Sequence, residues 1–429
     1  MDLGELVDYA ASLDCIHCGL CLRTCPTYRL TGSEASSPRG RIYMMRGVAE
    51  GRADPAEPGF AEEMDFCLVC RHCESVCPAG VRFGEMMETT RSGLESSIQR
   101  PWYAALARRL GRRIGFGHLL PSRRWLSLTA LLLRLAQRTG MLRVIAGIAG
   151  ERGRGLATLP PVPPRDERRL LPPCTAARGT ERGRCGMLEG CAMPELLGRV
   201  NRATAGVLAS IGWASERPPG HTCCGALHAH NGDLEGAARL ARGTIAAFDG
   251  LADEEGRPLP VVVNSAGCGA HMKEYGRLLA DDPQWAERAR EFSARVRDFT
   301  EFVEREAPAD YAPRAARDLG PVTYDDPCHL CHGQGVRTPP RALLDRMVGL
   351  ERVELDESES CCGSAGIYSM LRPADSAAVF ASKLEAFERS GARVLVTANP
   401  GCHLQWEAGL AQAGRDARVM HVAEVLEGT

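Results

Sequence analysis

Two cysteine runs near the N-terminus decide the organisation of the first part of the chain: Cys15-Ile-His-Cys18-Gly-Leu-Cys21-Leu-Arg-Thr-Cys25-Pro26 and Cys67-Leu-Val-Cys70-Arg-His-Cys73-Glu-Ser-Val-Cys77-Pro78. Each run has two residues between its first three cysteines, three residues before its fourth cysteine, and a proline directly after it. This spacing is typical of bacterial segments that bind two iron–sulfur clusters, where the fourth cysteine of each run binds the other cluster. The two runs therefore predict two [4Fe-4S] clusters.

The cysteine spacing also predicts which thiolates share a cluster. The expected ligands of the first cluster are Cys15, Cys18, Cys21 and Cys77, and those of the second cluster are Cys67, Cys70, Cys73 and Cys25. Zinc needs only four ligands per site and usually separates its Cys-x-x-Cys pairs, whereas a disulfide framework suits a short secreted chain. Two matching copies of four cysteines favour the cluster interpretation over both alternatives.

The composition indicates a multidomain protein of a reducing compartment. The chain has 429 residues, enough for two or three domains. It has 19 cysteines, and its first residues, Met1-Asp2-Leu3-Gly4-Glu5, show no basic or apolar region typical of a signal peptide. We therefore expect a cytoplasmic protein whose thiols serve metals. The formal net charge of −2 argues against a generally basic surface, so we expect no nucleic-acid partner.

The segment between the two cysteine runs predicts a helix with two arginines near its start. Ser37 and Pro38 suit a helix N-terminus, and apolar residues follow them. Arg39 and Arg41 either neutralise the negative charge of the clusters or lie at a solvated helix end, and the sequence leaves both interpretations open.

Residues 101–150 have a different composition, with nine arginines and no aspartate, glutamate or lysine. The arginines are at positions 108, 109, 112, 113, 123, 124, 134, 138 and 143, and apolar residues such as Trp102, Leu110, Trp125, Leu132 and Ile145 recur among them at roughly helical intervals. This pattern predicts basic amphipathic helices on an anionic membrane surface or an acidic partner, the alternative being helices that pack their apolar face on their own protein. The longest uncharged run, Trp125 to Leu133, is far shorter than the roughly 18 apolar residues that span a bilayer.

The C-terminal part contains an internal duplication. Its first copy has Gly190-Cys191, Cys223-Cys224-Gly225 and Asn264-Ser265-Ala266-Gly267-Cys268, and its second copy has Pro327-Cys328, Cys361-Cys362-Gly363 and Asn399-Pro400-Gly401-Cys402. The corresponding cysteines are offset by 328 − 191 = 137, 361 − 223 = 138 and 402 − 268 = 134 residues. This nearly constant offset predicts a duplicated domain.

Short apolar runs place these cysteines on loops after strands. Residues 261–263, 322–324 and 394–397 read as buried strands that lead into turns carrying a cysteine, and residues 234–248 and 376–389 read as helices. This alternation predicts parallel α/β units, whose ligands lie at the carboxyl edge of the sheet. Each copy is then expected to form a cysteine-lined crevice.

The crevices are candidate metal sites. The four thiols of the first crevice are Cys191, Cys223, Cys224 and Cys268, and those of the second are Cys328, Cys361, Cys362 and Cys402, with Cys331 and His332 nearby. Adjacent cysteines can bind different irons of an extended cluster, or one can bind metal while the other performs redox chemistry; a purely structural set is the alternative. Cys174 and Cys185 fit neither copy and are expected to be ordinary buried thiols.

These features define four segments of the chain. They are a two-[4Fe-4S] ferredoxin-type domain (1–100), arginine-rich amphipathic helices with a proline-rich linker (101–173), a first Cys-Cys-Gly domain (174–310) and a second Cys-Cys-Gly domain (311–429). The expected fold class is α+β, with an N-terminal helical module followed by two tandem α/β repeats.

The order of these motifs resembles the iron–sulfur subunits of glycolate oxidase, a bacterial glycolate dehydrogenase. The matching segments are Ser37-Pro38-Arg39-Gly40-Arg41-Ile42-Tyr43, Cys223-Cys224-Gly225-Ala226-Leu227-His228, Asn264-Ser265-Ala266-Gly267-Cys268-Gly269-Ala270, Asp325-Asp326-Pro327-Cys328-His329-Leu330, Cys361-Cys362-Gly363-Ser364-Ala365-Gly366-Ile367-Tyr368 and Asn399-Pro400-Gly401-Cys402. In one respect the chain departs from the fullest Cys-Cys-Gly pattern, which ends in Cys-x-x-Cys as in heterodisulfide reductase. Here the endings are Cys268-Gly-Ala-His271 and Cys402-His-Leu-Gln405. His271 is an alternative to the missing thiolate, but we expect it at the surface.

The resemblance implies an electron-transfer subunit without catalytic residues of its own. FAD-containing partner subunits would oxidise glycolate to glyoxylate, and this chain would pass the electrons to a respiratory acceptor such as quinone. The complex would lie in the cytoplasm, peripherally on the inner face of the membrane. Each Cys-Cys-Gly domain is a candidate for an additional iron–sulfur cluster.

Three alternative functions stay open at this point. The complex could be a related lactate or anaerobic glycerol-3-phosphate dehydrogenase, since their iron–sulfur subunits share these motifs. A Cys-Cys-Gly crevice could itself perform thiol or quinone chemistry. The repeats could also be a metal-free scaffold that only binds the flavoprotein subunits.

Overall fold

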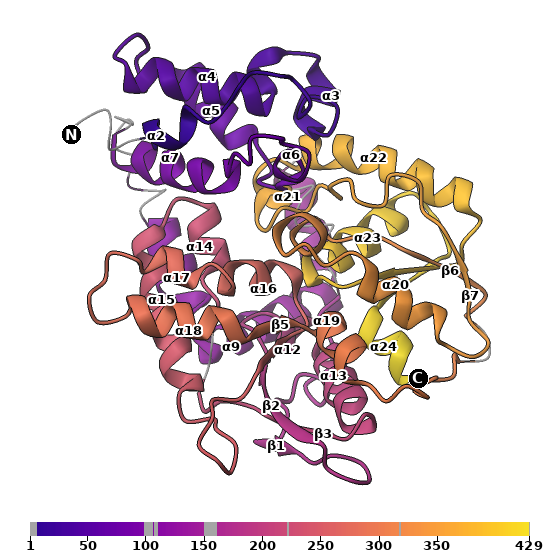
Figure 1. The fold of residues 1–429 in the computed structure, drawn as a ribbon. Helices are drawn as coiled ribbons and strands as arrows, with labels where there is room; N and C mark the ends of the chain where they lie inside the picture. Colours follow the sequence, from indigo (N-terminus) through magenta and orange to yellow (C-terminus); the bar gives the residue numbers. More distant parts are fainter. Residues whose placement is uncertain are drawn as a thin grey trace.

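The computed structural model describes residues 7–97, 106, 110–149, 161–220, 223–316 and 319–428. It contains an N-terminal helical module and two α/β domains, and the module lies across one end of both domains (Figure 1). The predicted α+β class, a helical module followed by two tandem α/β repeats, is confirmed.

The N-terminal module is built from short helices around a methionine-rich core. They are α2 (Tyr9–Ser12), α3 (Pro26–Thr31), the 3-10 turn η1 (Glu34–Ser36), α4 (Pro38–Ala49), α5 (Pro58–Phe66), α6 (His72–Ser75) and α7 (Phe83–Ser97). Proline is the first residue of α3, α4 and α5, a position where its fixed φ suits the helix and its missing N–H costs nothing. The Ser37 hydroxyl accepts a hydrogen bond from the Gly40 N–H at 2.9 Å and so caps α4, as the sequence predicted. Met45, Met64 and Met87 are buried in the core.

The arginine-rich segment forms helices whose large apolar side chains face outward. A π-helical turn η2 (Gly115–Leu119) is followed by α9 (Arg123–Arg138) and α10 (Met141–Ala149). In α9 the buried side chains are the small Ala130 and Ala136. Five larger side chains of α9 are 43% to 56% exposed, namely Trp125, Leu128, Leu131, Leu132 and Leu135. The alternative in which these helices bury their apolar face on their own protein is therefore wrong for α9. Trp102, Arg108, Arg109 and residues 151–160 of the predicted linker lie outside the described residues.

The two α/β domains repeat the same parallel sheet. The first contains β1 (Cys174–Thr175), β2 (Gly183–Leu188), β3 (Trp213–Glu216), β4 (Val261–Val263) and β5 (Val296–Asp298), in the order β1-β3-β2-β4-β5. The second contains β6 (Pro321–Tyr324), β7 (Glu351–Val353), β8 (Val394–Thr397) and β9 (Arg418–His421), in the order β7-β6-β8-β9. Apart from the antiparallel edge strand β1, all neighbouring strands are parallel, so the predicted duplication extends to strand order.

Helices cover both sheets. In the first domain they are α12 (Met193–Leu196), α13 (Gly198–Ser210), α14 (Ala226–His230), α15 (Leu234–Phe248), α16 (Ala266–Met272), α17 (Tyr275–Leu278), α18 (Ala286–Arg295) and α19 (Phe299–Glu306). In the second they are the π-helical turn η4 (His329–Gly333), α20 (Thr338–Asp345), α21 (Tyr368–Leu371), α22 (Pro373–Ser390), α23 (Pro400–Gln412) and α24 (Val422–Glu427). The predicted helices 234–248 and 376–389 correspond to α15 and α22.

The two repeats share one hydrophobic core. Helix α13 of the first repeat packs on α24 of the second repeat. Helix α19 of the first repeat likewise packs on α20 of the second. Buried residues of both sheets, including Val262, Val322 and Val396, belong to the same cluster. The loops that follow β4 and β8 also meet, because the Ala266 N–H donates to the Ala398 carbonyl at 3.3 Å. The sheets therefore present their carboxyl edges, where the predicted thiols lie, in a fixed relation to each other.

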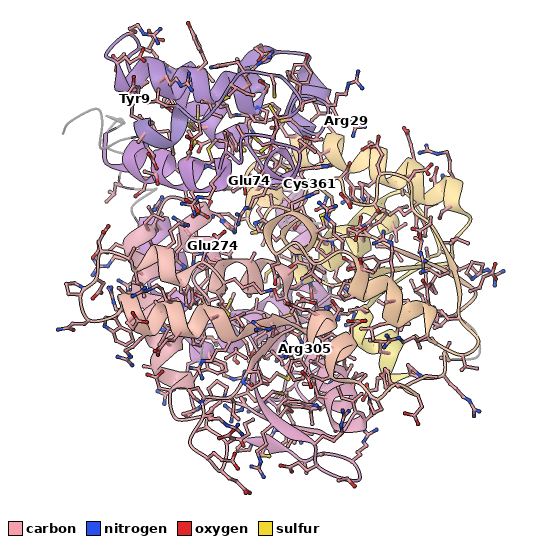
Figure 2. All side chains as sticks on the ribbon, viewed as in Figure 1. Tyr9, Arg29, Glu74, Glu274, Arg305 and Cys361 are labelled. Carbon is pink, nitrogen blue, oxygen red and sulfur yellow. The ribbon has the colours of Figure 1, made fainter. Side chains whose placement is uncertain are left out.

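The N-terminal module contacts both repeats. Arg29 forms an ion pair with Glu357 of the second repeat at 2.8 Å, and the Arg91 guanidinium donates to the His230 carbonyl of the first repeat at 2.7 Å. Figure 2 labels Glu74, Glu274 and Cys361, which lie where the module meets the two domains. The module is thus held against both sheets rather than tethered beside them.

A buried ion pair supports the second repeat directly beneath its cysteines. The side chains of Lys383 and Asp325 are each 1% exposed, and the Lys383 Nζ lies 2.5 Å from Asp325 Oδ1. The Trp406 indole N–H donates to Asp325 Oδ2 at 2.9 Å. Burial raises the pKa of Asp325 to about 6. The carboxylate therefore depends on its lysine partner to stay charged in the interior.

Replacing this lysine should destabilise the second domain. We expect Lys383→Met to lower the free energy of unfolding by roughly 3 kcal/mol, because Asp325 would be left buried without a counter-charge. The matched control is Arg389→Met on the same helix, whose side chain is 58% exposed and should contribute less than about 1 kcal/mol. Urea unfolding followed by circular dichroism measures both variants, and equal losses would contradict the prediction.

Candidate iron–sulfur sites

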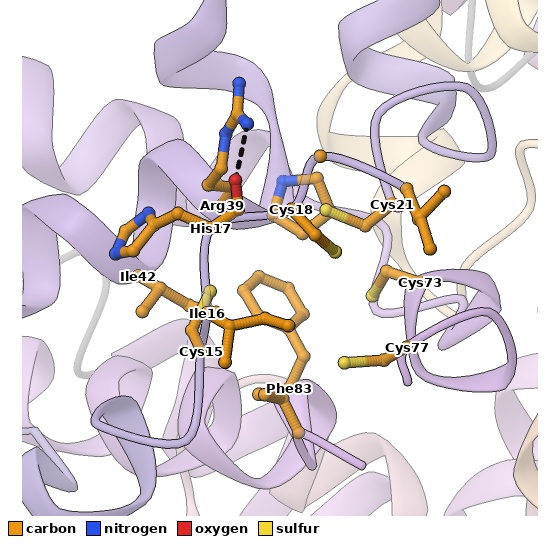
Figure 3. Close-up of a pocket in the computed structure, with 14 residues that line it drawn as sticks. Cys15, Ile16, His17, Cys18, Cys21, Arg39, Ile42, Cys73, Cys77 and Phe83 are labelled. Atoms are coloured by element: carbon orange, nitrogen blue, oxygen red, sulfur yellow. Dashed lines mark hydrogen bonds between the residues drawn. The ribbon is translucent and has the colours of Figure 1, made fainter. Parts of the chain in front are cut away.

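The four cysteines predicted to bind the first cluster line a common pocket in the N-terminal module, here called the first pocket. Its sulfur atoms come from Cys15, Cys18, Cys21, Cys73 and Cys77, and Figure 3 shows these side chains around the pocket. Ile42 and Phe83 contribute apolar wall. The Arg39 guanidinium also lines the pocket and donates to the His17 carbonyl at 2.9 Å.

The four cysteines predicted to bind the second cluster line a second pocket beside the first. Its sulfur atoms come from Cys25, Cys67, Cys70 and Cys73, so Cys73 borders both pockets. Arg41 lines this pocket and is fully buried, with its guanidinium donating to the carbonyl oxygens of Ser36 and Glu63, both at 2.7 Å. The interpretation of Arg41 as part of a solvated helix end is therefore wrong. Arginine lines both pockets, Arg39 the first and Arg41 with Arg71 the second.

The two cysteine runs share an unusual backbone conformation. Residues in the left-handed region follow the same pattern in each run, with His17 (φ 56°) and Gly19 (φ 80°) in the first and Val69 (φ 52°) and Arg71 (φ 63°) in the second. A β-branched residue such as valine adopts this conformation only at a cost of about 1–3 kcal/mol. Local strain of this kind is often found at functional sites. Here the left-handed residues turn the backbone of each run so that it surrounds its pocket.

The donor chemistry of both pockets suits iron–sulfur clusters. Burial raises the pKa of the Cys21 thiol to about 11, and burial also raises the pKa of Cys73 well above its usual range. Both thiols would be protonated at neutral pH without metal, and iron binding would release those protons. Several thiolates with an arginine in each wall form a soft donor set that fits a negatively charged iron–sulfur cluster.

The turn from Cys70 to His72 joins the second pocket to both repeats. Arg71 pairs with Glu74 of its own run at 3.0 Å and with Glu274 of the first repeat. The ring of His72 stacks on His332 of the second repeat, with ring centroids 4.0 Å apart and planes 16° apart. Cys70 itself packs in the same cluster as Cys361 of the second repeat, and hydrogen bonding with Cys361 lowers the pKa of Cys70.

The four cysteines predicted to line the first crevice lie together at the carboxyl edge of the first sheet. Cys191 follows β2, Cys223 and Cys224 follow β3, and Cys268 lies on α16 after β4. Hydrogen bonding pairs Cys191 with Cys223 and Cys224 with Cys268. The Tyr275 hydroxyl donates to the Cys224 carbonyl at 2.6 Å. Four thiols from three strand ends therefore meet in one place.

The second crevice repeats this arrangement and lies against the N-terminal module. Cys328 follows β6, Cys361 and Cys362 follow β7, and Cys402 lies on α23 after β8. Hydrogen bonding links Cys361 to Cys328 and Cys362, and Cys362 to Cys402. Together with Cys70, the second crevice brings five sulfur atoms together.

Other predicted positions differ from the sequence analysis or add to it. Cys185 is buried in β2, as expected, but the expectation that Cys174 is buried is wrong, because Cys174 lies exposed on the edge strand β1. Cys331 is buried, and its thiol donates to the Cys328 carbonyl at 3.8 Å. His332 faces His72 rather than the crevice thiols. The expectation that His271 lies at the surface is also wrong, because it is 2% exposed.

The glycine of each Cys-Cys-Gly motif is required by its backbone. Gly225 and Gly363 both have φ 86°, in the left-handed region. A Cβ atom on Gly363 would lie 2.6 Å from the Ser376 carbonyl oxygen, and one on Gly225 would lie 3.1 Å from the Ala237 carbonyl oxygen. Helices α15 and α22 therefore approach the motifs closely, and the left-handed backbone at this position favours glycine.

Comparisons with known proteins agree with this arrangement. A family model described as a 4Fe-4S dicluster domain matches residues 11–81, and one described as a cysteine-rich domain matches residues 185–273 and 322–407. The probable glycolate oxidase iron-sulfur subunit of Bacillus subtilis (strain 168) is 36% identical over 439 residues, covering 99% of this chain and 94% of that protein. The glycolate oxidase iron-sulfur subunit of Escherichia coli (strain K12) is 35% identical, covering 96% and 93%. This chain belongs to the family of glycolate oxidase iron–sulfur subunits.

Other similar proteins are shorter or more distant than these family members. Lactate utilization protein A of Shouchella clausii (strain KSM-K16) is 32% identical over 232 residues, which cover 53% of this chain and 91% of that protein. A solved structure described as a hypothetical protein from Helicobacter pylori has a TM-score of 0.50 and 9% sequence identity, covering 91% of this chain and 68% of that chain. This last likeness concerns the fold alone.

The Cys-Cys-Gly glycine should be intolerant of any side chain. We expect Gly363→Ala to destabilise the second domain by about 1 kcal/mol through its left-handed backbone and by roughly 2 kcal/mol more through the clash with Ser376. Gly391→Ala is the matched control, since Gly391 has φ 67° but no atom within 4 Å of the added Cβ. Thermal unfolding compares the two, and a Gly363→Ala loss no larger than the control would contradict the prediction.

Proposed function

We propose that this chain is the electron-transfer subunit of a complex that oxidises glycolate to glyoxylate. FAD-containing partner subunits carry the substrate site, and this chain passes their electrons to a respiratory acceptor such as quinone. The observation that supports this most strongly is the gathering of eight thiols from two distant runs around two adjacent pockets, in a chain that aligns with glycolate oxidase iron–sulfur subunits along nearly its whole length.

On this proposal two [4Fe-4S] clusters occupy the two pockets. Cys15, Cys18, Cys21 and Cys77 hold one cluster, and Cys67, Cys70, Cys73 and Cys25 hold the other. Because Cys73 borders both pockets, the two clusters would lie close together, as single-electron transfer requires. A cluster supplies the reversible redox change, while the protein determines its potential through burial and hydrogen bonds to sulfur.

The contact between Cys70 and Cys361 extends the proposed electron route. It places the second pocket directly beside the second crevice, which supports metal binding by Cys328, Cys361, Cys362 and Cys402. A redox-active group there would exchange electrons with the cluster of the second pocket. Cys191, Cys223, Cys224 and Cys268 offer a comparable thiol set in the first repeat.

A lactate-oxidising complex is the second candidate. It is favoured by the similarity to lactate utilization protein A, which covers 53% of this chain. A purified complex with its flavoprotein subunits distinguishes the substrates. Under the proposal, glycolate added without oxygen reduces the iron–sulfur clusters, as seen by their reduced-state electron paramagnetic resonance (EPR) signal, and lactate does so more slowly. Faster cluster reduction by lactate would favour the second candidate.

We assign the exposed face of α9 and α10 to a peripheral contact with the inner membrane surface. Val144 and Ile148 of α10 are 62% and 84% exposed, and they add to the apolar residues of α9. Arg124 and Arg138 of α9 are also exposed and suit anionic headgroups. Within the described part of the chain, no helix has the length and hydrophobicity needed to cross a bilayer.

Ligand variants should remove the clusters one at a time. Cys77→Ser and Cys25→Ser should each lower the iron content of the anaerobically purified chain by about four atoms, since each variant deletes one ligand of one cubane. Cys174→Ser is the control, because this exposed cysteine lies outside all four thiol groups. Iron analysis with EPR of the reduced chain measures the loss. A wild-type chain that binds no iron would overturn the proposed function.

Charges on the exposed apolar face should weaken membrane binding. We expect the double variant Leu132→Glu with Leu135→Glu to bind vesicles containing anionic lipid at least about tenfold more weakly, because two leucines would no longer enter the interface. The control is Leu371→Glu, an exposed apolar position on the second repeat that is 68% exposed. Sedimentation with vesicles measures binding. Equal binding by both variants would show that this face does not contact lipid.

A further inference from the structure

A buried histidine lies beside the first crevice without any hydrogen-bond partner. His271 is on α16, three residues after Cys268, so the two side chains project from the same side of the helix one turn apart. His271 is 2% exposed, and neither of its ring nitrogens has a hydrogen-bond partner in the described part of the chain. Leaving a buried polar atom unpaired is destabilising, so two unpaired nitrogens on one ring call for an explanation.

Other buried histidines in the described residues use at least one ring nitrogen. His228 Nε2 lies 3.0 Å from the Phe116 carbonyl oxygen, and His421 Nε2 lies 3.0 Å from the Asn264 carbonyl oxygen. In the second repeat the residue corresponding to His271 is Gln405, whose side-chain amide donates to Ser376 Oγ at 3.2 Å. The unpaired condition of His271 is therefore specific to the first repeat.

The surroundings place the ring of His271 at the Cys-Cys-Gly loop of the first crevice. A Cβ atom built on Gly225, the residue after Cys224, would lie 3.5 Å from His271 Nε2. The ring also meets the edge of Tyr275, with centroids 5.6 Å apart, and the Tyr275 hydroxyl holds the Cys224 carbonyl. His271 Nε2 is thus next to the loop that carries two of the four crevice thiols.

Ionisable side chains of the first repeat and of the N-terminal module lie near this ring. His230 of the first repeat lies 6.3 Å from His271 between ring centroids, and His230 Nδ1 lies 2.7 Å from Glu88 Oε1 of the N-terminal module. Arg277 lies 3.6 Å from the other Glu88 oxygen. Burial lowers the pKa of His271 to about 3.

We infer that His271 supplies a nitrogen ligand, through Nε2, to an iron–sulfur cluster in the first crevice. The ligand set of that crevice is then Cys191, Cys223, Cys224, Cys268 and His271, whereas the second crevice has thiols only. This inference rests on the proposed function, because it requires the first crevice to hold iron. A neutral imidazole in place of an anionic thiolate raises the reduction potential of a cluster. A thiolate at position 271 would therefore lower the potential of a cluster in the first crevice relative to the imidazole.

The test uses the full chain purified anaerobically, with natural-abundance or ¹⁵N-labelled histidine. Pulsed EPR of the cluster signals should show a nitrogen coupling that changes on ¹⁵N-histidine labelling. The coupling should be lost in His271→Cys and in His271→Gln. His271→Cys should keep the wild-type iron content and shift one midpoint potential to a lower value, because its thiolate can bind in place of the imidazole. His228→Gln, another buried histidine of the same repeat, should keep the coupling and the potential.

Three results would overturn the inference. One is a wild-type chain without any histidine nitrogen coupling, and another is a coupling that persists in His271→Cys. The third is an iron content of about eight atoms per chain, which would fill the two N-terminal pockets and leave the first crevice empty. That third result would leave the proposed electron-transfer function intact. A chain without iron would overturn both the proposed function and the inference about His271.

Discussion

The second pocket and the second crevice meet at one tight turn, Cys70-Arg71-His72, which is held between the module and the two repeats. Arg71 pairs with Glu274 of the first repeat, while His72 stacks on His332 and Cys70 packs with Cys361 of the second. The turn has a left-handed residue, Arg71, which the ion pairs on both sides hold in place. A change in this turn would alter the second pocket and the second crevice together. The module and the repeats are therefore in direct contact beside the second pocket.

The duplicated repeats have the same strand order but offer different chemistry. Both crevices receive cysteines from three strand ends, because parallel sheets collect their loops at one edge. The second crevice borders Cys70 and has Gln405 where the first has His271. The first is bordered instead by the cluster of His271, His230 and Glu88. The two repeats thus have the same strand order and the same placement of cysteines, but different residues lie next to those cysteines.

The arginine-rich helices differ from the rest of the molecule in how far their large apolar side chains are buried. Elsewhere in the described residues most large apolar side chains are buried in cores shared between elements, and the exposed ones, such as Leu371, are scattered. Helix α9 buries two alanines and exposes tryptophan and leucine. An exposed apolar face of this size is typical of surfaces that contact a membrane or another molecule, which is the basis of the proposed membrane contact.

The sequence by itself determined the parts of this protein that depend on local pattern. Cysteine spacing identified both runs, the constant offset identified the duplication, and short valine-rich segments before turns located β4, β6 and β8. Only the tertiary structure decided what depends on contacts between distant segments. The packing of Cys70 on Cys361, the burial of Arg41 and His271, and the exposure of Cys174 on an edge strand all belong to this class. Local pattern constrains backbone conformation over a few residues, but burial and partners are set by whichever surfaces meet when the domains pack.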